Sequence, residues 1–330
     1  MADTTVPNAR LIFILSQPRS GSSMLQRVLA SHSKCMTTSE PWVLLHPIYA
    51  LRPRGLKAKY SETTAYRGLM GFLSVFENGE EEYYQALRQM WSTLYAKAAA
   101  TEGKAVFIDK TPRYYLIGKE INRLFPDALM IVLLRNPMAV LVSVLDTWVK
   151  EDWAQLSNPP LRRDLFKGPG YLHEICEQVP GVMRVRYEDF VDQPEVDLQQ
   201  ICERMGIAYE PGMLRYGHHR KPAGELGDPV GVDRETAPVQ HRKEHWKARI
   251  GSSVVVAGVA RGYLKELDEG LLRTWGYPPE EMWAAVAAGE RWWSRRLPWD
   301  LLLRVPSTWP GKLLKPCVIF FAKLLERRGT

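Results

Sequence analysis

The chain has 330 residues, 45% of them hydrophobic, and a formal net charge of +7 at neutral pH. This length can bury one large core or two modest ones. The excess charge falls in residues 291–330, where nine Lys and Arg stand against two acids. Residues 1–290 are therefore formally neutral, which argues against a generally basic, nucleic-acid-binding surface. We expect no nucleic-acid partner.

The N-terminal residues MADTTVPNAR lack a basic region followed by a long apolar stretch, so we expect no signal peptide. The four cysteines form no C-x-x-C pair and show no framework spacing; they are Cys35, Cys176, Cys202 and Cys317. Reduced, mostly structural thiols are typical of a cytoplasmic protein. We expect that location.

Apolar runs that end at polar turns predict the strands of a sheet. The runs are 11–16, 105–108, 129–134 and 182–186. Helical patterns follow at 23–31 and at about 137–148, and Thr111 is placed to cap a helix that begins at Pro112. Continuous apolar strands separated by helices predict an α/β fold, with a P-loop-like parallel sheet flanked by helices.

Two segments interrupt this alternation within residues 1–290, which we expect to form one domain. Residues 50–103 form a mainly helical insertion, with apolar and aromatic residues at helical spacing. Residues 216–248 are rich in Gly, Pro, His and charge and have little periodicity, which predicts a loop.

The segment LIFILSQPRSGSSMLQRVLASH, residues 11–32, has the order of a phosphate-binding loop: apolar run, short turn, helix. The turn contains the small residues Ser20, Gly21, Ser22 and Ser23. Small residues let backbone N–H groups converge on an anion at a helix N-terminus, and Arg19 adds a permanent planar cation. The Walker A lysine position is occupied by Ser22, so ATP or GTP hydrolysis is disfavoured. An ordinary strand–turn–helix connection is the alternative.

A second candidate site follows the run at 129–134, in RNPMAVLVS. Arg135 stands at the expected carboxyl end of the strand, and Ser143 follows eight residues later on the next helix. Ligands of open α/β sheets bind at this end of the strands, so the pair is placed to hold a second phosphate. A solvated strand end is the alternative interpretation.

PRSGSSMLQRVLASH resembles the 5′-phosphosulfate loop of sulfotransferases that use 3′-phosphoadenosine 5′-phosphosulfate (PAPS), and LLRNPMAVLVSVL resembles their 3′-phosphate motif. DKTPRYY and RYEDF also recur in bacterial members in this order, and the resemblance covers roughly residues 10–250. It implies a PAPS site without a metal, formed by Arg19, Ser20, Gly21, Ser22, Ser23, Arg135 and Ser143.

The resemblance also implies catalytic roles. Sulfuryl transfer builds negative charge on the bridging oxygen of the donor, and Arg19 and Lys110 of DKTP are placed to stabilise it. Glu40 lies 21 residues after Arg19, the spacing of the catalytic glutamate in tyrosylprotein sulfotransferases, and is our candidate base. His46, and less plausibly His32, are the alternatives.

The late segment APVQHRKEHWKARI resembles a nucleotide-contacting lid of the family, but RKEHW replaces the usual serine before the tryptophan. Arg242, Lys243 and His245 therefore receive no role. In RYEDF we expect a structural function, with Tyr187 packing and Glu188 or Asp189 capping a turn.

Residues 291–330 interleave tryptophans with Arg and Lys, and their most apolar piece, 317–322, is too short to cross a bilayer. Such an amphipathic, helical tail suits peripheral contact with an anionic membrane, and a helix pair packed on the core is the alternative. We expect a PAPS-dependent enzyme with a small-molecule, lipid or glycan acceptor, shaped by 50–103 and 216–248. A nucleotide-binding kinase-like protein and a non-catalytic, membrane-associated, nucleotide-binding scaffold are the competing hypotheses.

Overall fold

The computed structural model describes residues 9–218, 236–238 and 241–291, together with Ser294, Cys317, Ile319 and Phe320. Its centre is a five-stranded sheet in the order β2-β3-β1-β4-β5, in which every pairing is parallel. The strands are β1 (Arg10–Ser16), β2 (Cys35–Thr37), β3 (Val106–Lys110), β4 (Leu129–Leu134) and β5 (Met183–Arg186). The predicted parallel α/β fold is confirmed.

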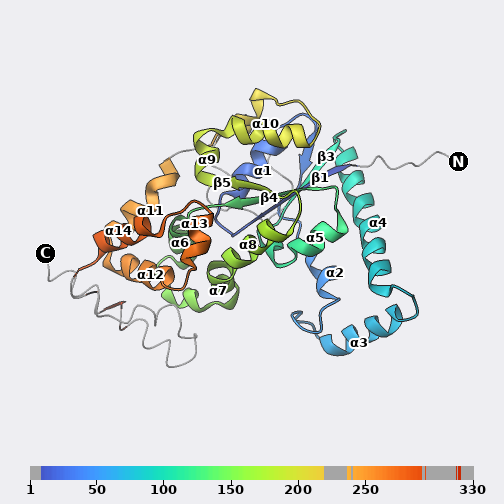
Figure 1. Cartoon of the computed structure of the whole chain (residues 1–330), viewed down its shortest axis with the longest axis horizontal. Helices are drawn as coiled ribbons and strands as arrows, with labels where there is room; N and C mark the ends of the chain where they lie inside the picture. Colours follow the sequence, from blue (N-terminus) through green and yellow to red (C-terminus); the bar gives the residue numbers. More distant parts are fainter. Residues whose placement is uncertain are drawn as a thin grey trace.

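Helices cover both faces of this sheet (Figure 1). They are α1 (Ser22–Ala30), α2 (Leu45–Tyr49), α3 (Glu62–Leu73), α4 (Gly79–Ala100), α5 (Gly118–Leu124), α6 (Pro137–Val144), α7 (Pro159–Phe166), α8 (Gly168–Gln178), α9 (Tyr187–Asp192), α10 (Pro194–Arg204), α11 (His241–Gly251), α12 (Val254–Leu264), α13 (Glu269–Thr274) and α14 (Pro279–Gly289). Short helical turns include the 3₁₀ segment η1 (Pro112–Leu116) and the π-helical segment η2 (Leu145–Val149).

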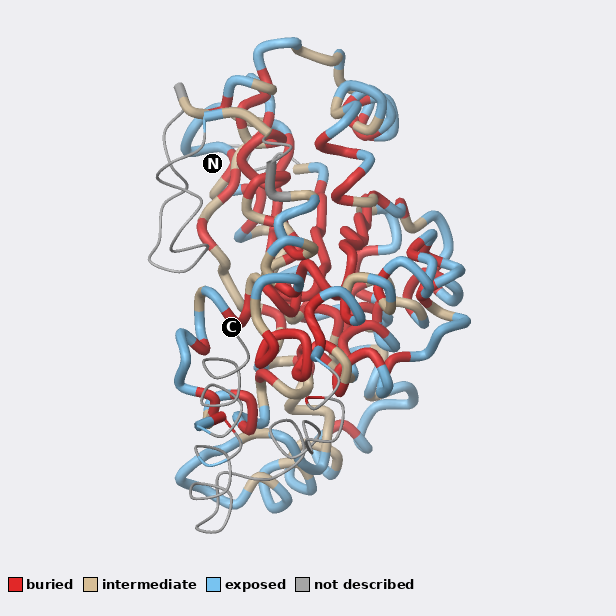
Figure 2. Tube along the Cα trace, turned by 90° about the vertical axis from the view of Figure 1, so that its left-hand side faces the viewer, coloured by how far each residue is buried: buried red, intermediate tan, exposed pale blue. Residues whose placement is uncertain are grey.

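The strand sequences are apolar throughout because both sheet faces are buried. Successive side chains of a strand point to opposite faces. In β1, Phe13 and Leu15 belong to a hydrophobic cluster with α4, α5, α6 and α12, while Ile12 and Ile14 belong to a second cluster with α1, α9 and α10. Figure 2 shows these buried residues gathered in the middle of the chain trace.

Two local expectations need correction. Residues 241–248, expected in the loop, form the first part of α11, where Trp246 is buried together with the later Ile250. Trp246 and Ile250 are four residues apart and so lie on one face of the helix. The other residues of the segment are mostly charged, and two apolar positions among them were too few to predict a helix from the sequence. Thr111 precedes η1 without capping it through its side chain, which turns toward the site instead.

The insertion 50–103 contains α3 and α4, and α3 lies at the lower right of Figure 1, away from the sheet. All four cysteines are free. Across the described parts of the chain, no helix combines the length and apolar composition needed to cross a bilayer. Most of 291–330 lies outside the described residues, so the membrane interpretation of the tail stays a prediction.

Candidate active site

The turn after β1 has the backbone of an anion-binding loop. Arg19 and Gly21 adopt left-handed conformations with φ of 72° and 92°. A Cβ atom at Gly21 would lie 2.6 Å from ring carbons of Tyr187, so both the conformation and the space require glycine. The helix that follows, α1, has no side-chain cap and no acidic residue in its first turn, which leaves its positive end suited to an anion.

Buried hydroxyls support this assignment. The side chains of Ser16 and Ser20 are almost completely buried, at 0% and 1% exposure, and their Oγ atoms have no hydrogen-bond partner in the described part of the structure. Buried polar groups are normally paired. A buried loop hydroxyl without a partner therefore fits an anionic ligand that accepts a hydrogen bond from it. The loop residues therefore fit the phosphosulfate group.

The two predicted arginines lie together because β1 and β4 are neighbouring strands. Arg135 Nη1 donates a hydrogen bond to the Arg19 carbonyl oxygen at 2.9 Å, and Arg19 Nε donates to Ser143 Oγ at 3.2 Å. The Arg135 guanidinium lies 4.1 Å from the centroid of the Tyr187 ring. Burial lowers the pKa of Arg135 from its usual value, and the side chain is 7% exposed.

RYEDF has the structural function expected of it. Tyr187 fills the space between Gly21 and Arg135, because its ring lies against the Cα atom of Gly21 on one side and under the Arg135 guanidinium on the other. The Glu188 carboxylate accepts hydrogen bonds from the Asn136 N–H at 3.0 Å and from the Tyr277 hydroxyl at 2.5 Å. Glu188 thereby ties the turn after β4 to the C-terminal helices.

Lys110, the last residue of β3, meets Glu40 in an ion pair. Lys110 Nζ lies 2.6 Å from Glu40 Oε1 and 3.2 Å from Ser23 Oγ. The Lys110 side chain is 1% exposed and that of Glu40 15%. Trp42 Nε1 donates to the second carboxylate oxygen of Glu40 at 3.2 Å, so both oxygens of the candidate base are held.

One cleft contains the phosphate loop and the candidate base. Its lining residues are Pro18, Arg19, Gly21, Ser22, Ser23, Glu40, Trp42, Pro112, Arg113 and Trp148. Sequence reasoning missed Trp42, Arg113 and Trp148. Arg113 stood within the quoted DKTPRYY motif, but Trp148 reaches the cleft through the π-helical turn η2, which no sequence pattern signalled. Arg113 is held by a bidentate pair with buried Asp164, at 3.0 and 2.7 Å.

The alternative bases lie elsewhere. His46 is exposed on α2, while His32 is buried and donates from Nε2 to the Ala208 carbonyl oxygen at 2.7 Å. Neither lines the cleft that contains Glu40. The geometry therefore favours Glu40.

In α11, His245 Nε2 lies 3.3 Å from an Asp146 oxygen, and Lys243 pairs with Asp192. The Arg242 side chain is outside the described residues. In the part of the chain that the structure describes, no group of three or more His, Cys, Asp or Glu is arranged to hold a metal ion.

The fold and the site together define an α/β protein with a loop suited to an anion at the carboxyl edge of its sheet. The family model described as "Sulfotransferase family" matches residues 11–211, which include the phosphate loop, Glu40, Lys110 and Arg135. The chain belongs to the sulfotransferase family.

Individual relatives are distant. Nodulation protein NoeE of Sinorhizobium fredii is 26% identical over 234 residues, which cover 64% of this chain and 53% of NoeE. The match thus spans about half the length of that relative. Among solved structures, the sulfotransferase domain of the Synechococcus PCC 7002 olefin synthase is 22% identical with a TM-score of 0.49, covering 73% of this chain and 88% of that domain. The sulfotransferase domain from the curacin biosynthetic pathway is 21% identical with a TM-score of 0.48, covering 72% and 90%.

Proposed function

We propose that the protein transfers a sulfuryl group from PAPS to a hydroxyl or amine of a small-molecule, lipid or glycan acceptor in the cytoplasm. The observation that carries the proposal is the Lys110–Glu40 pair, whose ammonium group lies 3.2 Å from Ser23 of the phosphate loop. The candidate base and the anion-binding loop therefore share one cleft, and the candidate charge-stabilising cation, Lys110, contacts both of them.

The donor would be held at its two anionic ends. Ser20, Gly21, Ser22, Ser23 and Arg19 would hold the phosphosulfate. Arg135 and Ser143 would hold the 3′-phosphate. Ser143 Oγ accepts from Arg19 Nε at 3.2 Å, and a hydroxyl that accepts one bond keeps its own proton for a phosphate oxygen. Ser143 would thus link the phosphosulfate site to the 3′-phosphate site.

The reaction needs a base on one side of the sulfur and a cation on the other. The acceptor oxygen or nitrogen forms a bond to sulfur while the bond from sulfur to the bridging oxygen breaks, and adenosine 3′,5′-bisphosphate leaves. Glu40 takes the acceptor proton. Arg19 and Lys110 offset the negative charge that grows on the leaving oxygen, where preorganised donors lower the barrier most.

A binding experiment tests the donor. We expect adenosine 3′,5′-bisphosphate to raise the melting temperature in the presence of a chelator, because ligands that bind only the native state stabilise it. Stabilisation by Mg-ATP alone would support the kinase-like hypothesis, and stabilisation by neither nucleotide would refute the proposed donor.

The acceptor is identified by incubating the enzyme with sulfur-labelled PAPS and an extract of its native cells. The molecule that gains label is the acceptor. Glu40→Gln serves as the matched control, because it keeps the size of the side chain but removes the base. Equal labelling by Glu40→Gln and the unmodified enzyme would remove Glu40 from the mechanism.

A further inference from the structure

A buried carboxylate lies behind the active-site cleft without lining it. Asp109 on β3 is 1% exposed and precedes Lys110. Three hydroxyls donate hydrogen bonds to it: Tyr95 of α4 at 2.7 Å, Tyr114 of η1 at 3.1 Å and Thr111 at 3.2 Å. A carboxylate accepts hydrogen bonds only, so an ionised Asp109 fixes the direction of all three O–H groups.

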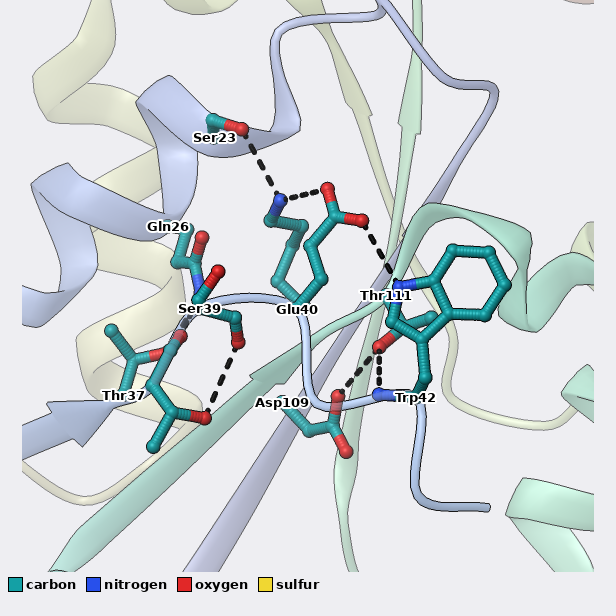
Figure 3. A network of polar contacts seen from close by, with 10 residues as sticks. Ser23, Gln26, Thr37, Ser39, Glu40, Trp42, Asp109 and Thr111 are labelled. Atoms are coloured by element: carbon teal, nitrogen blue, oxygen red, sulfur yellow. Dashed lines mark hydrogen bonds and ion pairs between the residues drawn. The ribbon is translucent and has the colours of Figure 1, made fainter. Parts of the chain in front are cut away.

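Two of these hydroxyls hold the segment that follows Glu40. Thr111 Oγ1 accepts from the Trp42 N–H at 3.2 Å, and the Tyr114 hydroxyl oxygen accepts from the Leu44 N–H at 3.2 Å. Because their protons are directed to Asp109, the lone pairs of both oxygens remain available to these backbone groups. Figure 3 shows the chain of contacts from Asp109 through Thr111 to Trp42 and on to Glu40.

The held segment has an unfavourable backbone conformation. Trp42 has a φ of 59°, in the left-handed region that residues with a side chain rarely adopt. Such a conformation persists only when surrounding contacts enforce it. The bond from the Trp42 N–H to Thr111 is one of these contacts, and the indole of the same residue donates to Glu40 Oε2.

We propose that Asp109 is a positioning residue for the base: it sets the polarity of the Thr111 and Tyr114 hydroxyls, which hold the backbone of residues 42–44 and thereby place Glu40. The inference rests on the proposed function, because it takes Glu40 as the base. Burial raises the pKa values of Tyr95 and Tyr114, so both keep the protons that they donate. Burial raises the pKa of Asp109 to about 6, and the three donated hydrogen bonds and the charge of Lys110 oppose this rise, so the carboxyl group is mostly ionised at neutral pH.

The test compares Thr111→Val, which deletes the hydroxyl at nearly constant volume, with Thr111→Ser, which keeps it. For Thr111→Val we expect kcat for labelled PAPS and the identified acceptor to fall about tenfold, as the loss of one buried hydrogen bond predicts. Hydrogen exchange of the Trp42 amide should accelerate by a similar factor. Thr111→Ser should restore both, and neither variant should change the Kd for adenosine 3′,5′-bisphosphate by more than about twofold.

Two further variants separate positioning from general packing. Asp109→Asn places an NH₂ donor against hydroxyls that must themselves donate, so kcat should fall at least as far as in Thr111→Val. Tyr95→Phe removes a bond to the same carboxylate but keeps the bonds from Thr111 and Tyr114 to residues 42–44, so kcat should stay near the unmodified value.

The proposal is overturned if Thr111→Val and Thr111→Ser share the same kcat and Trp42 exchange rate, or if Tyr95→Phe is as damaging as Asp109→Asn. A parallel loss of nucleotide affinity and kcat in Thr111→Val would also overturn it, because that pattern indicates a general loss of structure. Should the unmodified protein transfer nothing from PAPS, the proposed function fails, while the Trp42 exchange rates still decide whether Thr111 holds the segment.

Discussion

Replacing Arg135 with methionine removes the positive charge of the proposed 3′-phosphate site at nearly constant side-chain volume. In the structure the Arg135 guanidinium stacks 4.1 Å from the Tyr187 ring centroid and makes a 2.9 Å bond to the Arg19 carbonyl oxygen. Burial lowers the pKa of Arg135, so the charged side chain is costly to the free protein. Replacing a buried charge by an apolar side chain is often neutral or stabilising. We therefore expect Arg135→Met to melt near the temperature of the unmodified protein.

Ligand affinity should respond differently. A hydrogen bond from an ionised donor to a phosphate contributes about 1.5–3 kcal/mol, which corresponds to a 10- to 150-fold rise in the Kd for adenosine 3′,5′-bisphosphate. Titration calorimetry measures this change. The rise should be much smaller for adenosine 5′-phosphate, which lacks the 3′-phosphate.

Arg186→Met is the matched control. Arg186 ends the neighbouring strand β5 and lies 4.7 Å from the Tyr277 ring centroid, but it is paired with Asp189 and donates to the Gly276 carbonyl oxygen, whereas Arg135 donates to the Arg19 carbonyl oxygen of the phosphate loop. Its Kd should stay within about twofold of the unmodified protein. An unchanged Kd for Arg135→Met, or an equal loss for Arg186→Met, would refute the assignment of the 3′-phosphate seat.

Four further results are expected. Glu40→Gln should lower kcat by at least about 100-fold, the lower range for general-base catalysis, at an unchanged Kd for adenosine 3′,5′-bisphosphate; a fully active variant would transfer the role to another residue. Gly21→Ala should lower the free energy of unfolding by about 2–5 kcal/mol through backbone strain and a clash with a tyrosine ring, whereas Gly170→Ala, whose Cβ would meet open space, should not destabilise. Burial raises the pKa of Asp109 to about 6, so the native state keeps the proton of this carboxyl group to a higher pH than the unfolded chain does. The free energy of unfolding should therefore fall by up to about 3 kcal/mol as the pH rises from about 4 to 6. Urea titrations of Asp109→Asn should lack this fall. Deleting 291–330 should release the protein from anionic liposomes while nucleotide binding persists, and equal liposome binding would contradict a membrane-contacting tail.

The sheet was predictable because its strands are buried on both faces. Four strands were expected from continuous apolar runs, and each was found within two residues of the expected limits. The fifth, β2, has three residues, Cys35–Thr37, and one of them carries a hydroxyl. Gln26 Nε2 donates to that Thr37 hydroxyl at 2.8 Å, and the hydroxyl donates to the Ile108 carbonyl oxygen at 2.7 Å. A strand held by such tertiary contacts leaves no periodic signal in its own sequence.

The site was predictable where one strand end defines it, and less so where separate segments meet. Arg19 and Arg135 follow apolar runs directly, so the carboxyl edge of a parallel sheet places them together. The contacts of Glu40 depend on the conformation of Trp42, whose φ of 59° no propensity predicts. Thr111 has the sequence of a helix cap, but its hydroxyl bonds to Asp109 and Trp42. These two bonds depend on the Asp109 carboxylate and on the backbone N–H of Trp42, which is 69 residues away in the chain, so the sequence around Thr111 does not predict them.

The lysine that is absent from the phosphate loop has a counterpart on another strand. Ser22 occupies the Walker A lysine position at the start of α1, and Lys110 Nζ reaches Ser23 Oγ in the same turn from the end of β3. Because β3 is paired with β1 in parallel, the last residue of one strand lies beside the loop that follows the other. A cation supplied from β3 can contact the loop and Glu40 at once, at 3.2 and 2.6 Å. The missing loop lysine and the candidate base are thus linked through Lys110. Its ammonium group holds the Glu40 carboxylate before turnover and also lies against the loop where the transferred group would bind.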